Sequence, residues 1–375
     1  MMKSIFAGAL MGGLVLGQTN FTGDILHGYP VISALDIADV PANTISRYWI
    51  SAAQAQGGLD YFVPVFVARG TNSSLTTGRK LSLSASIHGD ELNGIPVVQR
   101  VFASINETVA SGGLNGTIIG VPTMNPNGNI HNQPNFYTSS DNGYYNNLNR
   151  LMPGTSVEEG GDLADAYDFT IWNNLWGNTS NVDIAVDLHT LSIGSNGPFW
   201  AYADFALPGV QRLAELAQPD IIKIDSGEPG SVETTWVGHN VPAITLEIGP
   251  AKIWNRTLIT RAENFIYRLM DDLYMDTTKA ANRTDPVVVD LSATYKATNL
   301  TKLRAMHSGW IEMDLTPLQD VTEGEVIGNI YNSWGDVLEE LTAPATGKVL
   351  TVNFDPAVEK GAGVLDIVYN ATSTE

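Results

Sequence analysis

The chain has 375 residues, of which 43% are hydrophobic and 16% charged, so it is long enough for two domains around a sizeable core. Its formal net charge is −20 at pH 7, and its Lys and Arg residues form no cluster. This charge excludes nucleic acid as a partner and disfavours an anionic membrane surface. The chain contains no cysteine, which excludes thiol catalysis and cysteine metal ligands.

Residues 1–17 have the pattern of a secretory signal peptide. Lys3 precedes an apolar stretch from Ile5 to Leu16, and Gly17 is a small residue at a candidate cleavage point. No later segment has about 18 consecutive apolar residues, so we expect no membrane span. We expect a secreted, extracellular glycoprotein, because Asn-x-Ser/Thr acceptor sites accompany this leader. These sites are Asn20, Asn72, Asn106, Asn115, Asn178, Asn255, Asn282, Asn299 and Asn370.

Strand-like and helix-like segments alternate from residue 80 to residue 275. The expected strands cover residues 80–87, 116–126, 181–190 and 241–249. The expected helices cover residues 91–105, 163–176, 207–218 and 261–275. The alternation predicts an α/β fold with a mixed, mostly parallel sheet flanked by helices.

The pattern changes near residue 282. The segment "ANRTDPVVV" is typical of a linker, and the short strand-like runs "GWIEMDL", "GEVIGNIY" and "GKVLTVNF" follow it with turn residues between them. We therefore expect a signal peptide at 1–17, an α/β domain at 18–284 and a small C-terminal β domain at 285–375.

Four metal-capable or acidic side chains lie at the ends of predicted strands. His88 and Glu91, in "SIHGDELNG", can face one ion if the chain turns sharply at Gly89. His189 ends the strand "VDLHT", and Glu247 is the only acidic residue in the apolar strand "ITLEIG". Open α/β sheets bind ligands at the carboxyl ends of their strands, so we expect a site there. Each residue alone has an ordinary alternative, such as a surface loop or a core ion pair.

Four motifs in order, "SIHGDELNG", "NLNRLMPG", "VDLHT" and "ITLEIG", resemble the succinylglutamate desuccinylase/aspartoacylase family of the zinc carboxypeptidase superfamily. The resemblance extends over about residues 78–350. It includes the C-terminal β domain, which is similar to a biotinyl/lipoyl-type barrel. The resemblance implies that residues 18–284 form a zinc-dependent catalytic domain.

The same resemblance implies roles for individual residues. His88, Glu91 and His189 would hold one Zn²⁺ per chain, and Glu247 would be the general base for water that attacks an amide carbonyl. Asn149 and Arg150 would bind a substrate carboxylate. Asp187 either orients His189 or is a solvated acid at the strand edge, and both alternatives stay open. Asn147 replaces the Asp of the family motif, which we expect to loosen the positioning of Arg150.

The chain departs from the family pattern at two arginines. Relatives usually have one after an "NPxG" turn, where it stabilises the developing oxyanion. Here "NPNG" is followed by no Arg before Arg150. Either another group such as His131 or Gln133 supplies the donor, or the chemistry differs, or the protein is a poor catalyst. Relatives often have a second arginine after "DLHT". This chain has Trp200 and Tyr202 there, which either belong to the core or line a substrate pocket.

Together these features predict a secreted zinc-dependent hydrolase, a deacylase or carboxypeptidase-like enzyme. It would cleave an amide bond in N-acyl amino acids or small peptides that bear a carboxylate. A doubly anionic substrate such as an acyl-aspartate is disfavoured by the missing arginine. The alternatives are a hydrolase or lyase that acts on an ester or a carbohydrate-derived substrate, and a non-catalytic zinc-binding relative. A structural glycoprotein would explain the acceptor sites but not four motifs in order.

Overall fold

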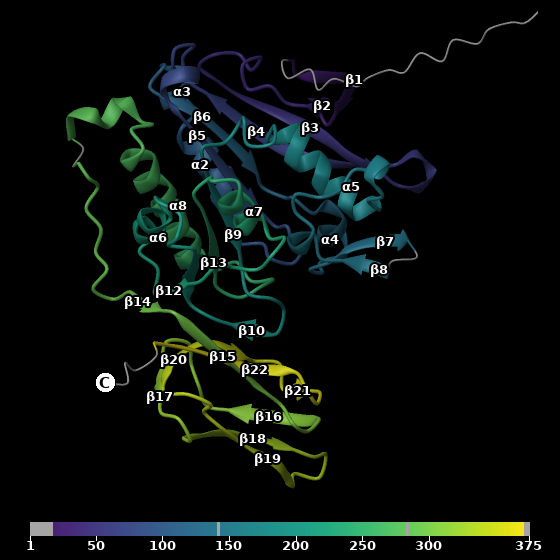
Figure 1. Ribbon diagram of the computed structural model, residues 1–375, viewed down its shortest axis with the longest axis vertical. Coiled ribbons are helices and arrows are strands. Elements are labelled where there is room, and N and C mark those ends of the chain that lie inside the picture. Colours follow the sequence, from purple (N-terminus) through teal and green to yellow (C-terminus); the bar gives the residue numbers. More distant parts are fainter. Residues whose placement is uncertain (1–17, 141–142, 283–284, 371–375) are drawn as a thin grey trace, which may run out of the picture.

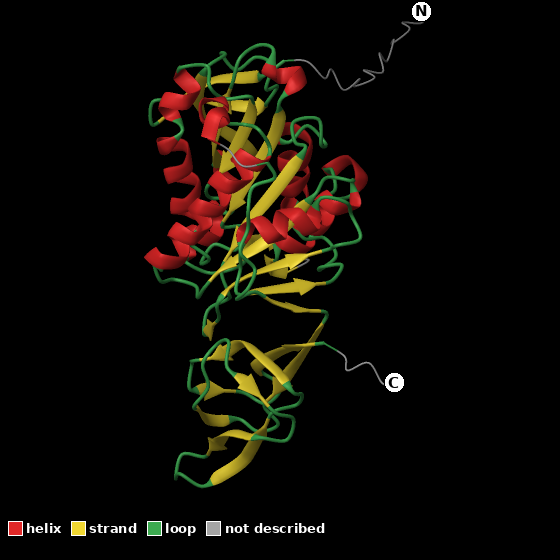
Figure 2. Cartoon of the chain, turned by 90° about the vertical axis from the view of Figure 1, so that its left-hand side faces the viewer, coloured by secondary structure: helices red, strands yellow, loops and turns green. Residues whose placement is uncertain are grey.

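The structure is a computed structural model that describes residues 18–140, 143–282 and 285–370. The expected signal peptide and residues 283–284 of the expected linker lie outside the described residues. A larger α/β part and a smaller β part lie one beyond the other along the long axis (Figure 1), and the helices belong to the larger part (Figure 2).

An 11-stranded mixed sheet forms the centre of the larger part, in the order β1-β2-β3-β4-β6-β5-β9-β13-β11-β12-β14. Six of its ten neighbouring pairs are parallel, so the expected mixed, mostly parallel sheet is confirmed. The strands are β1 (Asn20–Leu26), β2 (Tyr29–Ala34), β3 (Thr44–Gln54), β4 (Asp60–Arg69), β5 (Arg79–Ala85), β6 (Gly116–Val121), β9 (Ile184–His189), β11 (Phe199–Ala203), β12 (Ile221–Ile224), β13 (Ala243–Ile248) and β14 (Tyr295–Ala297).

Helices cover both faces of this sheet. One face packs against α2 (Gly94–Ser104), α6 (Val210–Ala217) and α8 (Arg256–Asp272), and the other against α5 (Leu163–Thr170) and α7 (Val232–Gly238). The helix α8 begins five residues before the expected position, because the Asn255 side chain caps it by accepting from the Leu258 N–H at 3.1 Å. The short helices are α1 (Ser74–Thr77), α3 (Asn106–Ala110) and α4 (Pro126–His131). None of the described helices is both long and apolar enough to cross a membrane.

Near the carboxyl ends of β9 and β13, alternation along the strand places apolar side chains on one face and polar side chains on the other. Successive side chains of a strand point to opposite sides of the sheet. On β9, Val186 and Leu188 pack into the core beneath α2 and α8, so Asp187 and His189 point to the face of α5 and α7. On β13 the core residue Leu246 is followed by Glu247 on this second face. The polar positions of neighbouring strands therefore lie on one face.

The smaller part consists of two sheets that enclose a core of their own. Their strands are β15 (Asn299–Arg304), β16 (Gly309–Met313), β17 (Asp320–Val321), β18 (Val326–Tyr331), β19 (Val337–Thr342), β20 (Gly347–Asn353), β21 (Ala357–Val358) and β22 (Gly363–Tyr369). Strand β10 (Ser195–Asn196) also pairs with β20, and β14 belongs to the central sheet, so the two parts exchange strands. The expected boundary between residues 284 and 285 stays a prediction.

A buried cluster joins the two parts. Leu191 and Trp200 of the larger part pack with Leu350 and Val368 of the smaller one. Between "NPNG" and "NLNR", α4 leads into a hairpin of β7 (Phe136–Ser140) and β8 (Gly143–Asn146). The cluster places β15, β20 and β22 against the polar face described above.

Candidate metal and substrate site

A tight turn after β5 brings His88 and Glu91 together. The backbone of Gly89 lies so close to Gly128 that a Cβ at position 89 would be 2.1 Å from the Gly128 carbonyl carbon. Only glycine fits there, because any side chain would displace the backbone of residue 128. The turn places His88 Nδ1 2.8 Å from Glu91 Oε1, so the two side chains could bind the same ion.

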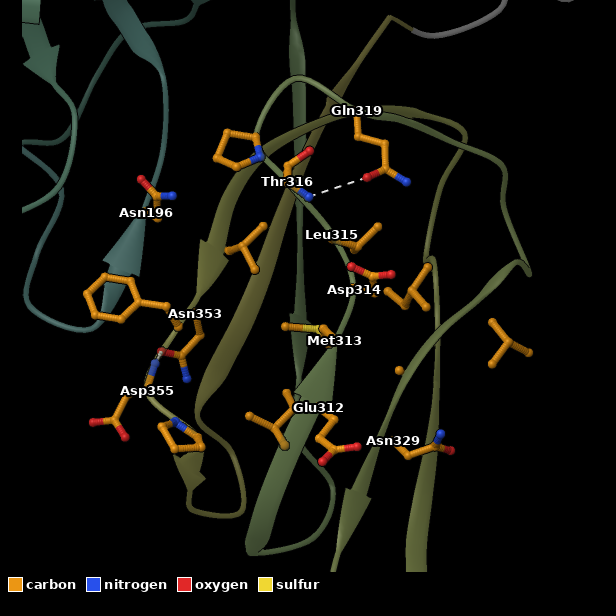
Figure 3. Close-up of a pocket in the computed structure, with 18 of the residues that line it drawn as sticks. Asn196, Glu312, Met313, Asp314, Leu315, Thr316, Gln319, Asn329, Asn353 and Asp355 are labelled. Carbon is orange, nitrogen blue, oxygen red and sulfur yellow. Dashed lines mark hydrogen bonds between the residues drawn. The ribbon is translucent and has the colours of Figure 1, made fainter.

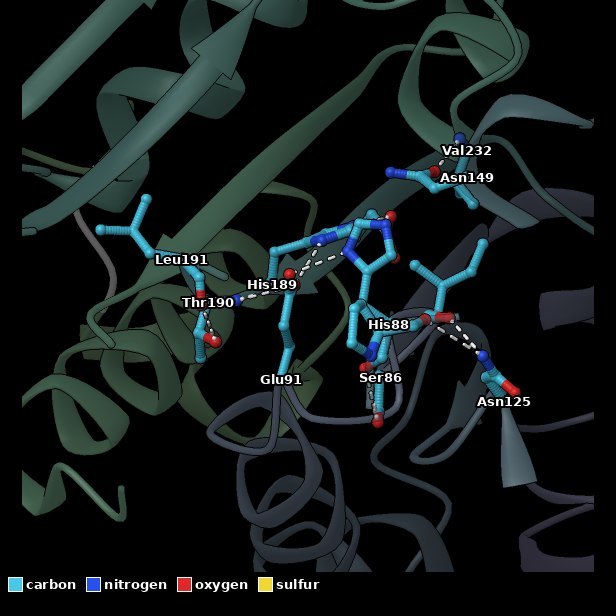
Figure 4. Close-up of polar contacts among 12 residues, drawn as sticks. Ser86, His88, Glu91, Asn125, Asn149, His189, Thr190, Leu191 and Val232 are labelled. Carbon is cyan, nitrogen blue, oxygen red and sulfur yellow. Dashed lines mark hydrogen bonds and ion pairs between the residues drawn. The ribbon is translucent and has the colours of Figure 1, made fainter. Parts of the chain in front are cut away.

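His189 completes a compact cluster at the end of β9. Its Nδ1 lies 2.8 Å from the second carboxylate oxygen of Glu91, Oε2 (Figure 4). One ligand atom from each of His88, Glu91 and His189 lies within 4.8 Å of the others. A single buried carboxylate therefore lies between two imidazoles, one from the turn after β5 and one from the end of its parallel neighbour β9.

The far nitrogen of each imidazole is held by another side chain. His189 Nε2 lies 2.6 Å from Asp187 Oδ2, while Ser84 donates to Asp187 Oδ1 at 2.6 Å. Asp187 is buried, so it orients His189 and is not a solvated acid. His88 Nε2 lies 3.1 Å from Asn147 Oδ1. Asn147 thus orients His88, whereas we had expected this residue only to affect the position of Arg150.

This donor arrangement fits a divalent metal ion. An imidazole that donates from Nε2 presents a lone pair at Nδ1, so its 2.8 Å contact with a carboxylate oxygen needs a proton or a cation between the two atoms. Burial alone would raise the pKa of Glu91, but His88 and His189 outweigh it and lower that pKa to about 2. Burial alone would lower the pKa of His189, but Asp187 and Glu91 outweigh it and raise that pKa. Two imidazole nitrogens and a carboxylate are donors that zinc accepts.

Glu247 lies beside the cluster on the same face of the sheet. It is the register partner of His189 in the parallel pair of β13 and β9. Its Oε2 is buried and has no hydrogen-bond partner among the described residues. Burial and the Glu91 carboxylate raise the pKa of Glu247 to about 8. A cation at the cluster would lower that pKa, because an opposite charge favours the ionised form.

A cavity of about 500 Å³ opens onto these four residues. Asn149, Arg150 and Tyr202 line it, as do Lys302, Leu350 and Asp366 of the smaller part. The structure therefore brings together every predicted site residue except His131. Trp200 belongs both to the buried cluster between the two parts and to the wall of this cavity, so our two alternatives for it hold together.

Asn149 and Arg150 lie next to the start of α7. Asn149 Oδ1 accepts from the Val232 N–H at 2.8 Å, and Arg150 Nη1 donates to the Asn149 carbonyl at 2.6 Å. Arg150 is the one arginine on the described wall of the cavity. His131 is exposed at the end of α4, where its ring packs 4.7 Å from that of Tyr137, and neither it nor Gln133 lines the cavity. The position of His131 offers no replacement for the missing arginine.

Five charged residues of this wall were not predicted from the sequence: Asp225, Glu228, Glu233, Lys302 and Asp366. Glu233 is in the first turn of α7, where an acid usually stabilises the helix dipole and gives no signal of a site. Lys302 and Asp366 belong to short strands of the smaller part, and no local pattern connects those strands with the motifs.

A second, more open hollow of about 730 Å³ lies in the smaller part (Figure 3). Its wall includes Asn196, Met313, Thr316 and Asn353, and none of the predicted site residues. No histidine or basic residue belongs to the described wall of this hollow. It is therefore separate from the candidate site.

The fold and the cluster define an α/β protein with a metal-capable His-Glu-His group at the carboxyl ends of its strands. Residues 77–273 match the succinylglutamate desuccinylase/aspartoacylase catalytic domain, and the chain belongs to this family of hydrolases of acylated amino acids. The match confirms the family expected from the four motifs. No curated protein sequence matches the chain.

Solved structures of similar fold cover most of the chain. The ectoine utilization protein EutE (DoeB) from Ruegeria pomeroyi, solved with product bound, has a TM-score of 0.68 and 16% identity over 88% of this chain and 99% of its own. A succinylglutamate desuccinylase/aspartoacylase from Rhodobacter sphaeroides has a TM-score of 0.67 and 16% identity over 88% and 95%. An aspartoacylase family protein from Mesorhizobium loti has a TM-score of 0.66 and 18% identity over 89% and 97%. At these identities the likeness concerns the fold.

Glu233 gives a pH-dependent prediction for stability. Burial and the charges of Asp225, Asp204 and Asp187 raise its pKa from 4.5 to about 8. Between these values the folded protein holds a proton that the unfolded chain releases, so stability falls as pH rises by about 1.4 kcal/mol per pH unit. Glu233→Gln has no such proton. We expect E233Q and the wild type to have similar stability at pH 4, and E233Q to be the more stable at pH 8.

Urea unfolding at several pH values would measure this difference in the free energy of unfolding. Glu263→Gln is a matched control, because Glu263 forms an ion pair with Arg100 at 2.8 Å on the surface. A difference between E233Q and the wild type that stays constant from pH 4 to pH 8 would contradict the shifted pKa.

Proposed function

We propose that the protein is a secreted, zinc-dependent hydrolase that cleaves the amide bond of an N-acyl amino acid or a small peptide. One observation carries the proposal. The His88, Glu91 and His189 cluster lies in the same cavity as Glu247, a buried carboxylate with an oxygen that has no partner among the described residues. A metal-dependent amidohydrolase needs at least a metal site and a nearby carboxylate that is free to act as a base.

In this proposal His88, Glu91 and His189 hold the zinc ion, with Asn147 and Asp187 fixing the two imidazoles. Zinc supplies Lewis acidity and makes water a stronger acid when it is bound. Glu247 takes the proton of the attacking water and passes it to the leaving nitrogen of the amide. The position of Glu247 suits this role, because burial raises the pKa of its carboxyl while a zinc ion at the cluster would favour the ionised form that accepts a proton.

Arg150 and Asn149 are the groups proposed to bind the substrate carboxylate. The side-chain oxygen of Asn149, Oδ1, accepts a hydrogen bond from the Val232 N–H, and its side-chain NH₂ makes no hydrogen bond within the described chain (Figure 4). Arg150 is exposed and has one long contact, 3.9 Å, from its Nε to Glu228. Both residues therefore have donors available for a carboxylate at the mouth of the cavity.

Metal analysis of the purified protein tests the cofactor. We expect about one zinc ion per chain, because a catalytic site uses three protein ligands. His189→Ala and Glu91→Gln should lose the ion, since each removes one of three ligands. His307→Ala is the control and should retain the zinc ion, because His307 is exposed in the smaller part. Full zinc content in H189A, measured by elemental mass spectrometry, would rule out this site.

The catalytic role is tested by the release of free amine from N-acetyl amino acids and blocked dipeptides. We expect Glu247→Gln to lower kcat by about 10²–10⁴-fold while zinc content stays the same, because general base catalysis contributes about this much. Glu263→Gln, which changes a surface ion pair, should keep the wild-type rate. Wild-type rates in E247Q would show that another group is the base, and no release by the wild type would count against amide hydrolysis.

Secretion is proposed from the leader and from the acceptor asparagines. Of the acceptors whose side chains the structure describes, Asn20, Asn72, Asn106, Asn178 and Asn370 are exposed and the others are half-buried. None of these described acceptor side chains is fully buried, so a glycan would not have to enter the core. We expect the protein in the medium of a secreting eukaryotic host, with a mass that falls on treatment with peptide N-glycosidase. A smaller fall is expected for Asn20→Gln with Asn106→Gln, and cell-retained protein without any mass change would refute this proposal.

A further inference from the structure

The charges on the cavity wall are strongly unequal. Six carboxylates line the cavity, while Arg150 and Lys302 are its two lysine or arginine side chains. Lys302 Nζ lies 3.3 Å from Asp366 Oδ1, and Arg150 Nε lies 3.9 Å from Glu228 Oε2, so each cation already faces an acid. Even a divalent ion at the cluster leaves an excess of negative charge. A second carboxylate on the substrate would have no unpaired cation to meet on the described wall.

Two carboxylates of this wall, Glu247 and Glu233, have no counter-ion among the described residues. Glu247 lies beside the metal-capable cluster, which leaves Glu233. Glu233 is 2% exposed, its Oε1 is buried without a hydrogen-bond partner, and it forms no ion pair within the described chain. By contrast, Asp225 pairs with Lys223 at 2.6 Å and accepts from the Gly227 N–H. A buried carboxyl without a partner costs free energy. This cost is expected for a group whose partner is part of the ligand.

Gly227 is needed for this carboxyl to stay at the cavity wall. Gly227 lines the cavity, and a Cβ at that position would lie 2.6 Å from Glu233 Oε2. Any larger residue would clash with the carboxylate and displace it. A purely structural acid in the first turn of α7 would bind the free backbone N–H groups there, but the Ser231 side chain already caps that turn through the Thr234 N–H.

We infer that the cavity takes an N-acyl amino acid whose amino-acid half carries a positively charged side chain, and that Glu233 is the counter-ion of that charge. The inference rests on the proposed function, because it adds a substrate class to the same cavity. Arg150 and Asn149 bind the α-carboxylate, the amide lies at the metal cluster, and the substrate ammonium replaces the proton on Glu233. Glu233 is a specificity-determining residue in this assignment and takes no part in the chemical step.

Two kinds of measurement separate this inference from the proposed function. The first is calorimetric binding of the free products L-ornithine and L-lysine, each compared with its isostere that has CH₃ in place of NH₃⁺, L-norleucine and L-2-aminoheptanoate. We expect at least one cationic product to bind about tenfold or more tightly than its isostere, because a buried charge pair is at stake. Glu233→Gln should reduce this ratio to within about threefold. Binding needs no turnover, so the result does not depend on hydrolysis.

The second measurement is kcat/KM for the Nα-acetyl derivatives of the same amino acids and of L-glutamate. We expect the cationic substrate to exceed its neutral isostere by about tenfold or more, with acetylglutamate the poorest. Glu228→Gln removes an exposed charge from the same wall and should keep the ratio, whereas E233Q should abolish it.

The outcomes are distinguishable. Equal binding of a cationic product and its isostere by the wild type would overturn the inference without any variant, even if every amide were hydrolysed. Hydrolysis of none of the amides, with the binding preference present and lost in E233Q, would overturn the proposed function and leave the role of Glu233 intact. A preference that persists in a folded E233Q would assign the charge recognition to another residue and overturn the inference.

Discussion

The carboxylate of Glu91, shared between two imidazoles, is the interaction on which the site depends. Its two oxygens lie 2.8 Å from His88 Nδ1 and His189 Nδ1, although His189 follows Glu91 by 98 residues. Such a contact requires β5 and β9 to be neighbours in the sheet, with Ser84 opposite Asp187. It also requires the turn at Gly89, because a longer loop would move Glu91 away from the strand end. The strand order and one tight turn therefore determine the geometry of the ligands.

The two faces of the central sheet both carry an apolar core, but they differ at the candidate site. On the face of α2 and α8, leucine, isoleucine and valine form a continuous core that supplies stability. On the opposite face, each of the strands β5, β9 and β13 carries a buried polar side chain, namely Ser84, Asp187 and Glu247. Burying these groups costs free energy unless they are paired. The pairs formed by Asp187 offset part of that cost, while Glu247 keeps one oxygen without a partner among the described residues.

Much of the site could be predicted from the sequence because its main residues follow short strands. His88, His189 and Glu247 each end or lie in a run whose β-branched and apolar residues predict a strand, and parallel strands bring their ends together. The contact of His88 with Asn147 joins residues 59 apart, and nothing in the local pattern indicates it. Strands β1 to β4 and the insertion of β14 into the central sheet also escaped prediction. Pairing between distant strands depends on tertiary packing, which periodicity does not encode.

The cavity is defined more by which charges are paired than by their sum. Lys302 pairs with Asp366, Lys223 with Asp225 and Arg150 with Glu228, while two imidazoles flank Glu91. Two glutamates of the wall therefore remain, and their surroundings differ. Glu247 lies beside the metal-capable cluster, where a cation would favour its ionised form and leave it ready to accept a proton. Glu233 lies beside Gly227, where no fixed charge of the described chain compensates it. In our proposals these identical side chains therefore have separate roles that their neighbours determine, Glu247 toward the reacting water and Glu233 toward the substrate.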